Sequence, residues 1–228
     1  MKIFIVAAHP DDEVLGCGGS IAKWSKKGYE VNVMIMAEGE TSRDENRIRA
    51  NKLKKLSELT ASSNRANKIL GVKNLWINGM PDNRMDSLDL LDVVKVIEKK
   101  IFKTKPQIVI THNSSDLNVD HQIVHRAVMT ACRPQSECSV KKILTFEVPS
   151  STEWNSPNIK DAFSPNLFED ITETLDLKIS ALKEYKSEMR PWPHPRSYES
   201  VRHLAYWRGS IVCKKAAEAF MLIRSIED

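Results

Sequence analysis

Residues 9–13, His-Pro-Asp-Asp-Glu, place four titratable side chains in five positions directly after the apolar run Lys2–Ala8. Such a run is typical of a buried strand, which has no structural need to end in so much charge. Imidazole and carboxylate groups are usual ligands of divalent zinc. If the chain turns sharply after His9, that residue and Asp12 can reach one ion, and Asp11 then lies beside it. Asp11 would be placed to act as a general base on an activated water.

A second polar cluster, Asp120-His121, follows another predicted strand. Catalytic zinc sites use three protein ligands, and His121 would supply the third from the same edge of the sheet. The competing interpretation is that residues 9–13 form a solvated loop in which Asp12 caps the next helix. The presence of two His/Asp clusters at one sheet edge favours the metal site over this loop.

Strands and helices are predicted to alternate along most of the chain. Strands are expected over 2–8, 30–36, 75–77, 107–111 and 142–148. Helices are expected over 18–28, 88–102, 120–132, 171–189 and 216–226, and a long helix is expected to follow the polar stretch 38–49 and to end at 69. Strand–helix–strand units give parallel sheets. The predicted fold is therefore α/β, a Rossmann-like open sheet, mostly parallel, with helices on both faces. Ligands bind such sheets beyond the carboxyl ends of the strands, where residues 9–13 and 112–121 lie.

Composition narrows the class of protein. A chain of 228 residues suits one α/β domain, and 41% hydrophobic with 28% charged residues is ordinary for a globular protein. A net charge of +4 without a basic cluster does not favour nucleic-acid binding. The four cysteines form no CxxC pair, which predicts reduced thiols in a cytoplasmic protein. The acidic segment interrupts any leader pattern, and no apolar run approaches the ~20 residues of a membrane span.

Two segments, AAHPDDEVLGCGGSIAKW (7–24) and DLNVDHQIVHRAV (116–128), resemble the PIG-L/LmbE-like family of zinc-dependent N-deacetylases. Shorter segments that support the likeness are MPDNRMD (80–86), FSPNLF (163–168) and RGSIVCKKAAEAF (208–220). The likeness extends over residues 1–228 and implies a single deacetylase domain. It also implies a hydrolase that removes acetyl groups from N-acetylglucosamine units of sugar conjugates.

The resemblance assigns roles residue by residue. His9 and Asp12 match the first two zinc ligands of the family, and His121 matches the third. Asp11 matches its general base. The implied cofactor is Zn²⁺, with another divalent metal such as Fe²⁺ as the alternative. The implied partner is a small-molecule or glycoconjugate substrate, whose identity the sequence leaves open. The sequence also leaves the oligomeric state open and allows a homo-oligomer.

One position departs from the family pattern. Many members carry a histidine three residues before the third ligand, where it protonates the leaving amine or stabilises the oxyanion; here that residue is Asn118. Either Asp11 makes both proton transfers or another residue supplies the acid. His194 is the candidate, because the prolines on both sides restrict its backbone. A surface histidine in a rigid loop is the competing interpretation.

Several other residues are candidates for substrate contact. An arginine near the site could hold a phosphate or uronate group of a sugar conjugate, and the candidates for substrate binding are Arg43, Arg84, Asn118 and Arg196. For each arginine the competing interpretation is a solvated or ion-paired surface role. His112, at a strand end, and His125, one helical turn after His121, either orient groups at the site or are packing residues.

Two other functions are weighed against the deacetylase. The glycines of GCGGS (16–20) do not complete a dinucleotide-binding fingerprint, because HPDDE fills the place of its first glycine and Ile21 that of its third. We interpret these glycines as allowing a close approach of helix and strand beneath the site. A non-catalytic protein that kept the fold is the other alternative, which the departure at Asn118 supports and the intact His9, Asp11, Asp12 and His121 set opposes.

Overall fold

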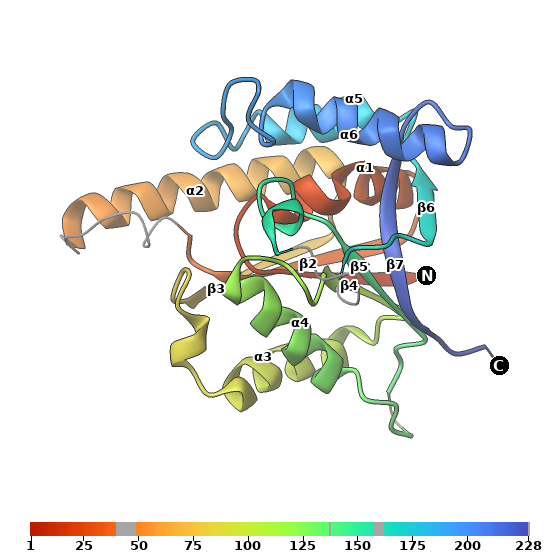
Figure 1. Ribbon diagram of the computed structural model, residues 1–228. Coiled ribbons are helices and arrows are strands. Elements are labelled where there is room, and N and C mark those ends of the chain that lie inside the picture. Colours follow the sequence, from red (N-terminus) through yellow and green to blue (C-terminus); the bar gives the residue numbers. More distant parts are fainter. Residues whose placement is uncertain (40–48, 137, 157–161, 228) are drawn as a thin grey trace.

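The computed structural model describes residues 1–39, 49–136, 138–156 and 162–227 (Figure 1). At its centre lies a seven-stranded sheet in the order β3-β2-β1-β4-β5-β7-β6. The parallel strands are β1 (Lys2–Ala7), β2 (Glu30–Ala37), β3 (Asn74–Met80), β4 (Ile108–His112) and β5 (Lys142–Phe146). Strand β7 (Ala217–Ser225) runs antiparallel to β5, and β6 (Leu167–Asp170) antiparallel to β7. The predicted open, mostly parallel sheet is confirmed.

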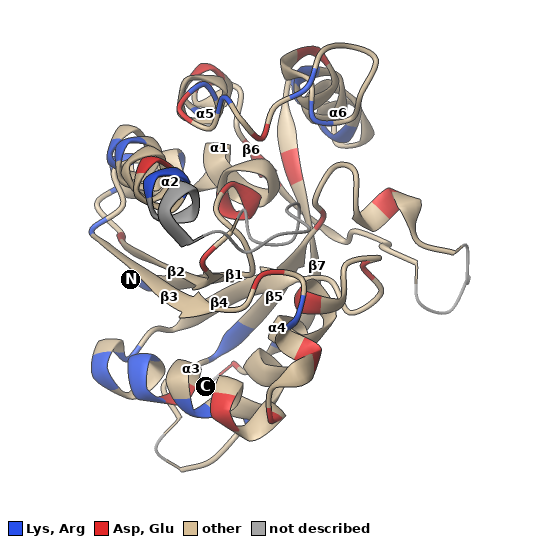
Figure 2. Ribbon diagram, turned by 90° about the vertical axis from the view of Figure 1, so that its left-hand side faces the viewer, with Lys and Arg blue, Asp and Glu red and all other residues tan. Residues whose placement is uncertain are grey.

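Helices cover both faces of this sheet (Figures 1 and 2). On one face lie α1 (Asp12–Lys26), α2 (Arg49–Leu70), α5 (Leu175–Leu182) and α6 (Tyr198–Ile211), and on the other α3 (Leu90–Thr104) and α4 (Val119–Ala131). Short 3-10 helices span Met85–Ser87 and Thr152–Trp154. No helix in the described part of the chain combines the length and apolar character that crossing a bilayer requires.

Strand β1 is buried on both faces, as its continuous apolar sequence requires. Ile3 and Ile5 pack into the core beneath α1 and α2, whereas Phe4 and Val6 face the core beneath α3 and α4. Side chains of a strand alternate between the two faces of a sheet, so both layers hold β1 in place. The strand is therefore a rigid support for the residues that follow it.

Gly16 shows why a glycine-rich segment follows the charged one. A side chain at this position of α1 would collide with the ring of Phe146 at the end of β5. The expected close approach of helix and strand is therefore present at Gly16. The helix also begins at Asp12, six residues before the predicted start at Gly18, and Cys17 has non-helical dihedral angles (φ −147°, ψ 24°), so a kink divides α1 just before Gly18.

The predicted helix over 216–226 is wrong, since these residues form β7. Their composition favours a helix, but the segment fills the gap between β5 and β6 and pairs with both. Tertiary pairing of this kind overrides local propensity. The predicted helix over 171–189 shortens to α5, because the chain turns afterwards and directs Tyr185 into the core. Sequence reasoning also misses β6, a four-residue edge strand, and α6.

Glu218 of β7 connects the end of the sheet to the first helix. Its buried carboxylate accepts hydrogen bonds from the backbone N–H groups of Gly19, at 2.9 Å, and Ser20, at 2.7 Å. Lys178 of α5 donates to the same carboxylate at 2.6 Å and to the carbonyl of Leu15 at 2.8 Å. A buried charge requires such partners, so these contacts fix α1 against β7 and α5.

Candidate metal centre and active site

The carboxyl ends of three strands bring the predicted metal ligands together with two aspartates, Asp82 and Asp116, that sequence reasoning did not single out. His9 and Asp12 follow β1, Asp82 follows β3, and Asp116 and His121 follow β4. These ends meet because β1 lies between β2 and β4 in a parallel sheet. The interpretation of residues 9–13 as a solvated loop is wrong, because Asp12 is completely buried.

Three donor atoms form a nearly equilateral triangle at this edge. His9 Nδ1 lies 3.2 Å from His121 Nε2, and Asp12 Oδ2 lies 3.3 Å from the first and 3.2 Å from the second. Ligand atoms about 2.0–2.1 Å from a tetrahedral zinc ion are about 3.3–3.4 Å apart. Two imidazoles and one carboxylate at this spacing fit a divalent metal ion, and three protein ligands are typical of a catalytic site.

The ring of His9 is oriented by carboxylates behind it. Its Nε2 lies 3.0 Å from Asp120 Oδ2 and 3.3 Å from Asp82 Oδ1, which places the proton on Nε2 and leaves Nδ1 for a metal ion. Asp120 also accepts the backbone N–H groups of Asn83, at 2.7 Å, and Met85, at 2.9 Å. Burial would lower the pKa of His9, but Asp12 and Asp120 raise it to about 10. The surroundings of His9 thus favour positive charge.

Replacing Asp120 by Asn tests this orientation. We expect Asp120→Asn to weaken metal binding by about 10–100-fold, the usual effect of removing a carboxylate that orients a ligand histidine. Competition with a chromogenic chelator measures the affinity. Asp86→Asn, an exposed aspartate in the adjacent turn, is the matched control. Equal affinity in Asp120→Asn and wild type would show that Asp120 does not support the site.

His121 is held from two sides. Its Nδ1 lies 3.0 Å from Asp116 Oδ1, and its ring stacks on His112 with centroids 3.9 Å apart. Asp116 is fixed in turn by the hydroxyl groups of Ser151 and Thr152. Burial would lower the pKa of His121, but Asp12 and Asp116 raise it to about 9. His121 therefore lies in an acidic environment with Nε2 directed to the triangle.

His112 and His125 take supporting positions. His112 Nε2 accepts the backbone N–H of Ala8 at 2.8 Å, and burial holds the pKa of this ring well below its usual value. The ring is thus neutral and packs against His121. His125 Nδ1 lies 2.9 Å from the carbonyl oxygen of His112, and burial lowers its pKa as well. Neither contributes an atom to the triangle of His9, Asp12 and His121.

Asp11 occupies a constrained position next to the triangle. Its φ of 110° is unusual for a residue with a side chain. The turn is held by Glu13, whose carboxylate accepts the Asp11 backbone N–H at 3.1 Å, the hydroxyl of Tyr185 at 2.7 Å and the amide of Asn67 at 2.8 Å. Burial raises the pKa of Asp11 well above its usual range, although Arg196, 2.7 Å from its carboxylate, opposes the shift. A raised pKa suits a group that must take up a proton.

Comparison with known proteins identifies the chain. A family model described as PIG-L, GlcNAc-PI de-N-acetylase, matches residues 4–132, more than half of the chain. The uncharacterized deacetylase YaiS of Escherichia coli (strain K12) is 31% identical over 191 residues, which cover 81% of this chain and 90% of that protein. The chain belongs to the PIG-L family.

Solved structures share the fold of this PIG-L protein. N,N'-diacetylchitobiose deacetylase from Pyrococcus horikoshii matches with a TM-score of 0.76 and 20% identity, covering 98% of this chain and 84% of the other. GalB, the 4-carboxy-2-hydroxymuconate hydratase from Pseudomonas putida KT2440, matches with a TM-score of 0.77 and 20% identity, covering 100% and 98%. Both likenesses show the fold alone. Because one fold serves a deacetylase and a hydratase, the reaction must be argued from site residues.

A cavity of about 100 Å³ lies at the triangle. Its lining residues are His9, Pro10, Asp11, Gly39, Leu59, Asp82, Asn83, Asn118, Glu188 and Arg196. Of the candidates for substrate contact, Asn118 and Arg196 therefore border the cavity. Arg84 is exposed on the adjacent turn, and Arg43 lies outside the described residues.

Asn118, the departure from the family pattern, has a structural role. Its side-chain oxygen caps α4 by accepting the backbone N–H of Asp120 at 2.9 Å, and its amide donates to Asn83 Oδ1 at 2.7 Å. Asparagine is among the preferred N-cap residues. An amide cannot act as a general acid, so the side chain links the two loops at the cavity instead.

His194 lies beside the site but is not among the residues that line its cavity. Its Nδ1 accepts the backbone N–H of Arg196 at 3.0 Å, and its ring meets Trp154 edge to face. Arg196 bonds Asp11 and, through Nε, the hydroxyl of Ser150 at 2.8 Å. Substrate contact by Arg196 stays a prediction, and its guanidinium group also pairs with the candidate base.

Proposed function

We propose that this PIG-L family enzyme is a zinc-dependent hydrolase that removes the acetyl group from an N-acetylated amino-sugar conjugate. The observation that carries the proposal is the triangle of His9, Asp12 and His121 with the buried carboxylate of Asp11 beside it. The names of the relatives, which include diacetylchitobiose and N-acetylglucosaminyl-malate deacetylases, support an N-acetylated sugar as substrate. Four unpaired cysteines support a reducing compartment, which we propose is the cytoplasm.

The metal ion would be held by His9, Asp12 and His121. A divalent ion bound there supplies Lewis acidity, which polarises an amide carbonyl and lowers the pKa of water. Imidazole and carboxylate donors suit Zn²⁺, and two histidines with one carboxylate also suit Fe²⁺. We propose Zn²⁺ as the native ion, to be tested by elemental analysis of the purified protein.

Asp11 would move the proton. Its carboxylate takes a proton from the water that adds to the acetamide carbon. As the C–N bond breaks, the same group returns the proton to the amine nitrogen, so acetate and a free amino sugar are released. Arg196 and Glu13 hold this carboxylate and its backbone in place through contacts at 2.7 and 3.1 Å. Preorganisation of this kind lowers the cost of reaching the transition state.

We propose that His194 also contributes to catalysis, and the pH–rate profile of a His194 variant tests its role. Because its Nδ1 accepts the Arg196 N–H, we expect His194→Gln to lower kcat while the alkaline limb of the pH–rate profile stays in place. The imidazole would then act as a neutral group that positions Arg196. Loss of the alkaline limb would instead identify His194 as the general acid. A profile and rate equal to wild type would remove His194 from the mechanism.

The experiment that tests the function is an acetate-release assay over a panel of N-acetylhexosamine conjugates with the metal-loaded enzyme. We expect acetate and free amine in equal amounts from at least one conjugate. Metal-loaded protein that releases no acetate from any member would contradict the proposal. A hydratase would add water to its substrate without releasing acetate, so the assay separates the two reactions.

A further inference from the structure

The reaction cavity is too small for a whole sugar conjugate. Its volume of about 100 Å³ is well below the ~300–1,000 Å³ of pockets that enclose small-molecule ligands. The space beside Asp11 thus suits an acetamido group, and the remainder of a substrate must lie in an adjoining depression. The adjoining surface would then decide which conjugate is accepted.

A groove of about 430 Å³ lies next to this cavity. Pro149 and Pro195 line it, and the residues that follow each of them, Ser150 and Arg196, are joined by a 2.8 Å hydrogen bond. Arg196 also borders the reaction cavity and bonds Asp11. The loops of Pro149 and Pro195 therefore border the groove on one side and, through Arg196, the reaction cavity on the other.

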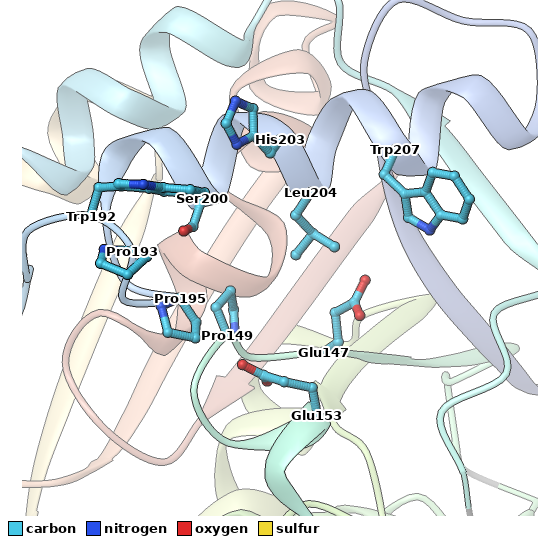
Figure 3. Close-up of a pocket in the computed structure, with 10 residues that line it drawn as sticks. All are labelled: Glu147, Pro149, Glu153, Trp192, Pro193, Pro195, Ser200, His203, Leu204 and Trp207. Carbon is cyan, nitrogen blue, oxygen red and sulfur yellow. The ribbon is translucent and has the colours of Figure 1, made fainter.

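Two tryptophans stand at opposite ends of the groove (Figure 3). Trp192, on the loop before α6, is 57% exposed, and Trp207, on α6, is 63% exposed. His203 meets the Trp192 ring edge to face, with centroids 5.4 Å apart, and so supports it from α6. Large exposed aromatic surfaces of this kind mark binding sites more often than isolated apolar residues do.

Carboxylates line the opposite side of the groove (Figure 3). Arg208 donates to both oxygens of Glu147, at 2.8 and 2.7 Å, which fixes this side chain. Glu153 accepts the backbone N–H groups of Ser150 and Ser151. A carboxylate has about four lone-pair positions, so both retain capacity to accept hydroxyl groups.

We infer that this groove binds a second, uncharged or amino-bearing pyranose ring of the substrate, an inference that rests on the proposed deacetylase function. The C–H faces of a pyranose pack on indole rings, and its hydroxyl groups donate to carboxylates. Arg208 balances the charge of Glu147, so an anionic group such as a phosphate would be repelled chiefly by Glu153. Trp192 and Trp207 are thus specificity-determining residues for the length of the sugar chain.

Another groove, of about 440 Å³, also adjoins the reaction cavity through Leu59. Its lining includes Lys55, Glu58, Arg65 and Glu184, and none of its described lining residues is aromatic. Arg65 and Glu184 already pair at 2.6 Å. Without an apolar face for a sugar ring, this groove is the weaker candidate for the second pyranose.

The test compares N-acetylglucosamine with the disaccharide N,N'-diacetylchitobiose as substrates. We expect Trp192→Ala and Trp207→Ala each to lower kcat/KM for the disaccharide by about tenfold and to leave the value for the monosaccharide unchanged. Trp192→Phe should keep most of the disaccharide activity, because it retains an aromatic face. Phe102→Ala, which removes a 71% exposed aromatic from α3 on the other face of the sheet, is the matched control.

The outcomes separate the groove from the proposed function. If wild type releases acetate but neither tryptophan variant distinguishes the two substrates, the groove assignment fails and the deacetylase stands. If no substrate releases acetate, the proposed function fails, and the groove is judged by calorimetric binding of the deacetylated disaccharide. Binding that Trp192→Ala abolishes would support the groove, and absence of binding to wild type would overturn it.

Discussion

The Asp11→Asn variant is expected to retain its metal ion and to lose about 10²–10⁴-fold in kcat, the usual contribution of a general acid–base group. Asparagine has nearly the same shape as aspartate and is tolerated at positive φ better than most residues, so the turn at φ 110° should persist. Its amide oxygen can still accept from Arg196, but the side chain cannot take up a proton from water. Elemental analysis and steady-state kinetics on one preparation measure both effects.

The control for Asp11→Asn is the exposed substitution Asp86→Asn, which should keep wild-type kcat and metal content. Two results would contradict the assignment of Asp11. A rate near wild type would show that another group moves the proton, and loss of the metal ion would show that Asp11 is a ligand. A circular dichroism spectrum like that of wild type would exclude unfolding as the cause of a lost rate.

The His121→Ala variant is expected to lose most of its bound metal ion and, with it, the activity. His121 Nε2 supplies one corner of the donor triangle, and two ligands bind an ion far more weakly than three. The matched control is His125→Gln, one helical turn further along α4, which should retain the ion. Inductively coupled plasma mass spectrometry after dialysis gives the metal content per chain.

A variant of a second ligand shows whether loss of the metal ion reflects the missing ligand or a folding defect. Removal of His121 leaves the buried carboxylates of Asp12 and Asp116 close together without their shared imidazole, which costs stability. His9 is more exposed than His121, with 13% of its side chain accessible, and Asp120 keeps the backbone N–H groups of Asn83 and Met85 as donors, so His9→Ala should cost less stability and still lose the ion. Full metal content in both variants would refute the three-ligand site.

Sequence reasoning locates this site because its main residues are local in the chain. His9, Asp11 and Asp12 follow a strand whose apolar pattern is easy to recognise, and His121 follows another. Parallel topology then brings the two strand ends to one edge. The roles of these residues in catalysis stay predictions until the variants are measured.

Other parts of the site depend on contacts that no local pattern reveals. Glu13 meets Tyr185 across 172 positions of the chain, and Arg196 meets Asp11 across 185. The turn at Asp11 and the partner of its carboxylate are therefore visible only in three dimensions. One local signal in this region is Ser197, which could have predicted the start of α6, because its hydroxyl caps that helix by accepting the Ser200 N–H.

The same dependence on distant contacts explains the main error in the predicted fold. Residues 217–225 contain Ala, Glu, Met and Leu, which favour helices in isolation. They form a strand because β5 and β6 offer edges on both sides and because Phe220 is buried between the sheet and the helices. Neither partner can be inferred from the segment alone.

The contacts of Glu218 determine when, during synthesis of the chain, the active site can be completed. The helix that follows the HPDDE segment is bonded at Ser20 to a residue 198 positions later. A ribosome adding about 5–20 residues per second needs roughly 10–40 s to cover that distance. At the start of this interval the nascent chain has made only two of the three metal ligands, His9 and Asp12. It lacks β7 throughout and Arg196 for most of the time. Activity therefore begins after synthesis of the last strand, and chaperones that meet the chain earlier encounter an acidic, incomplete site.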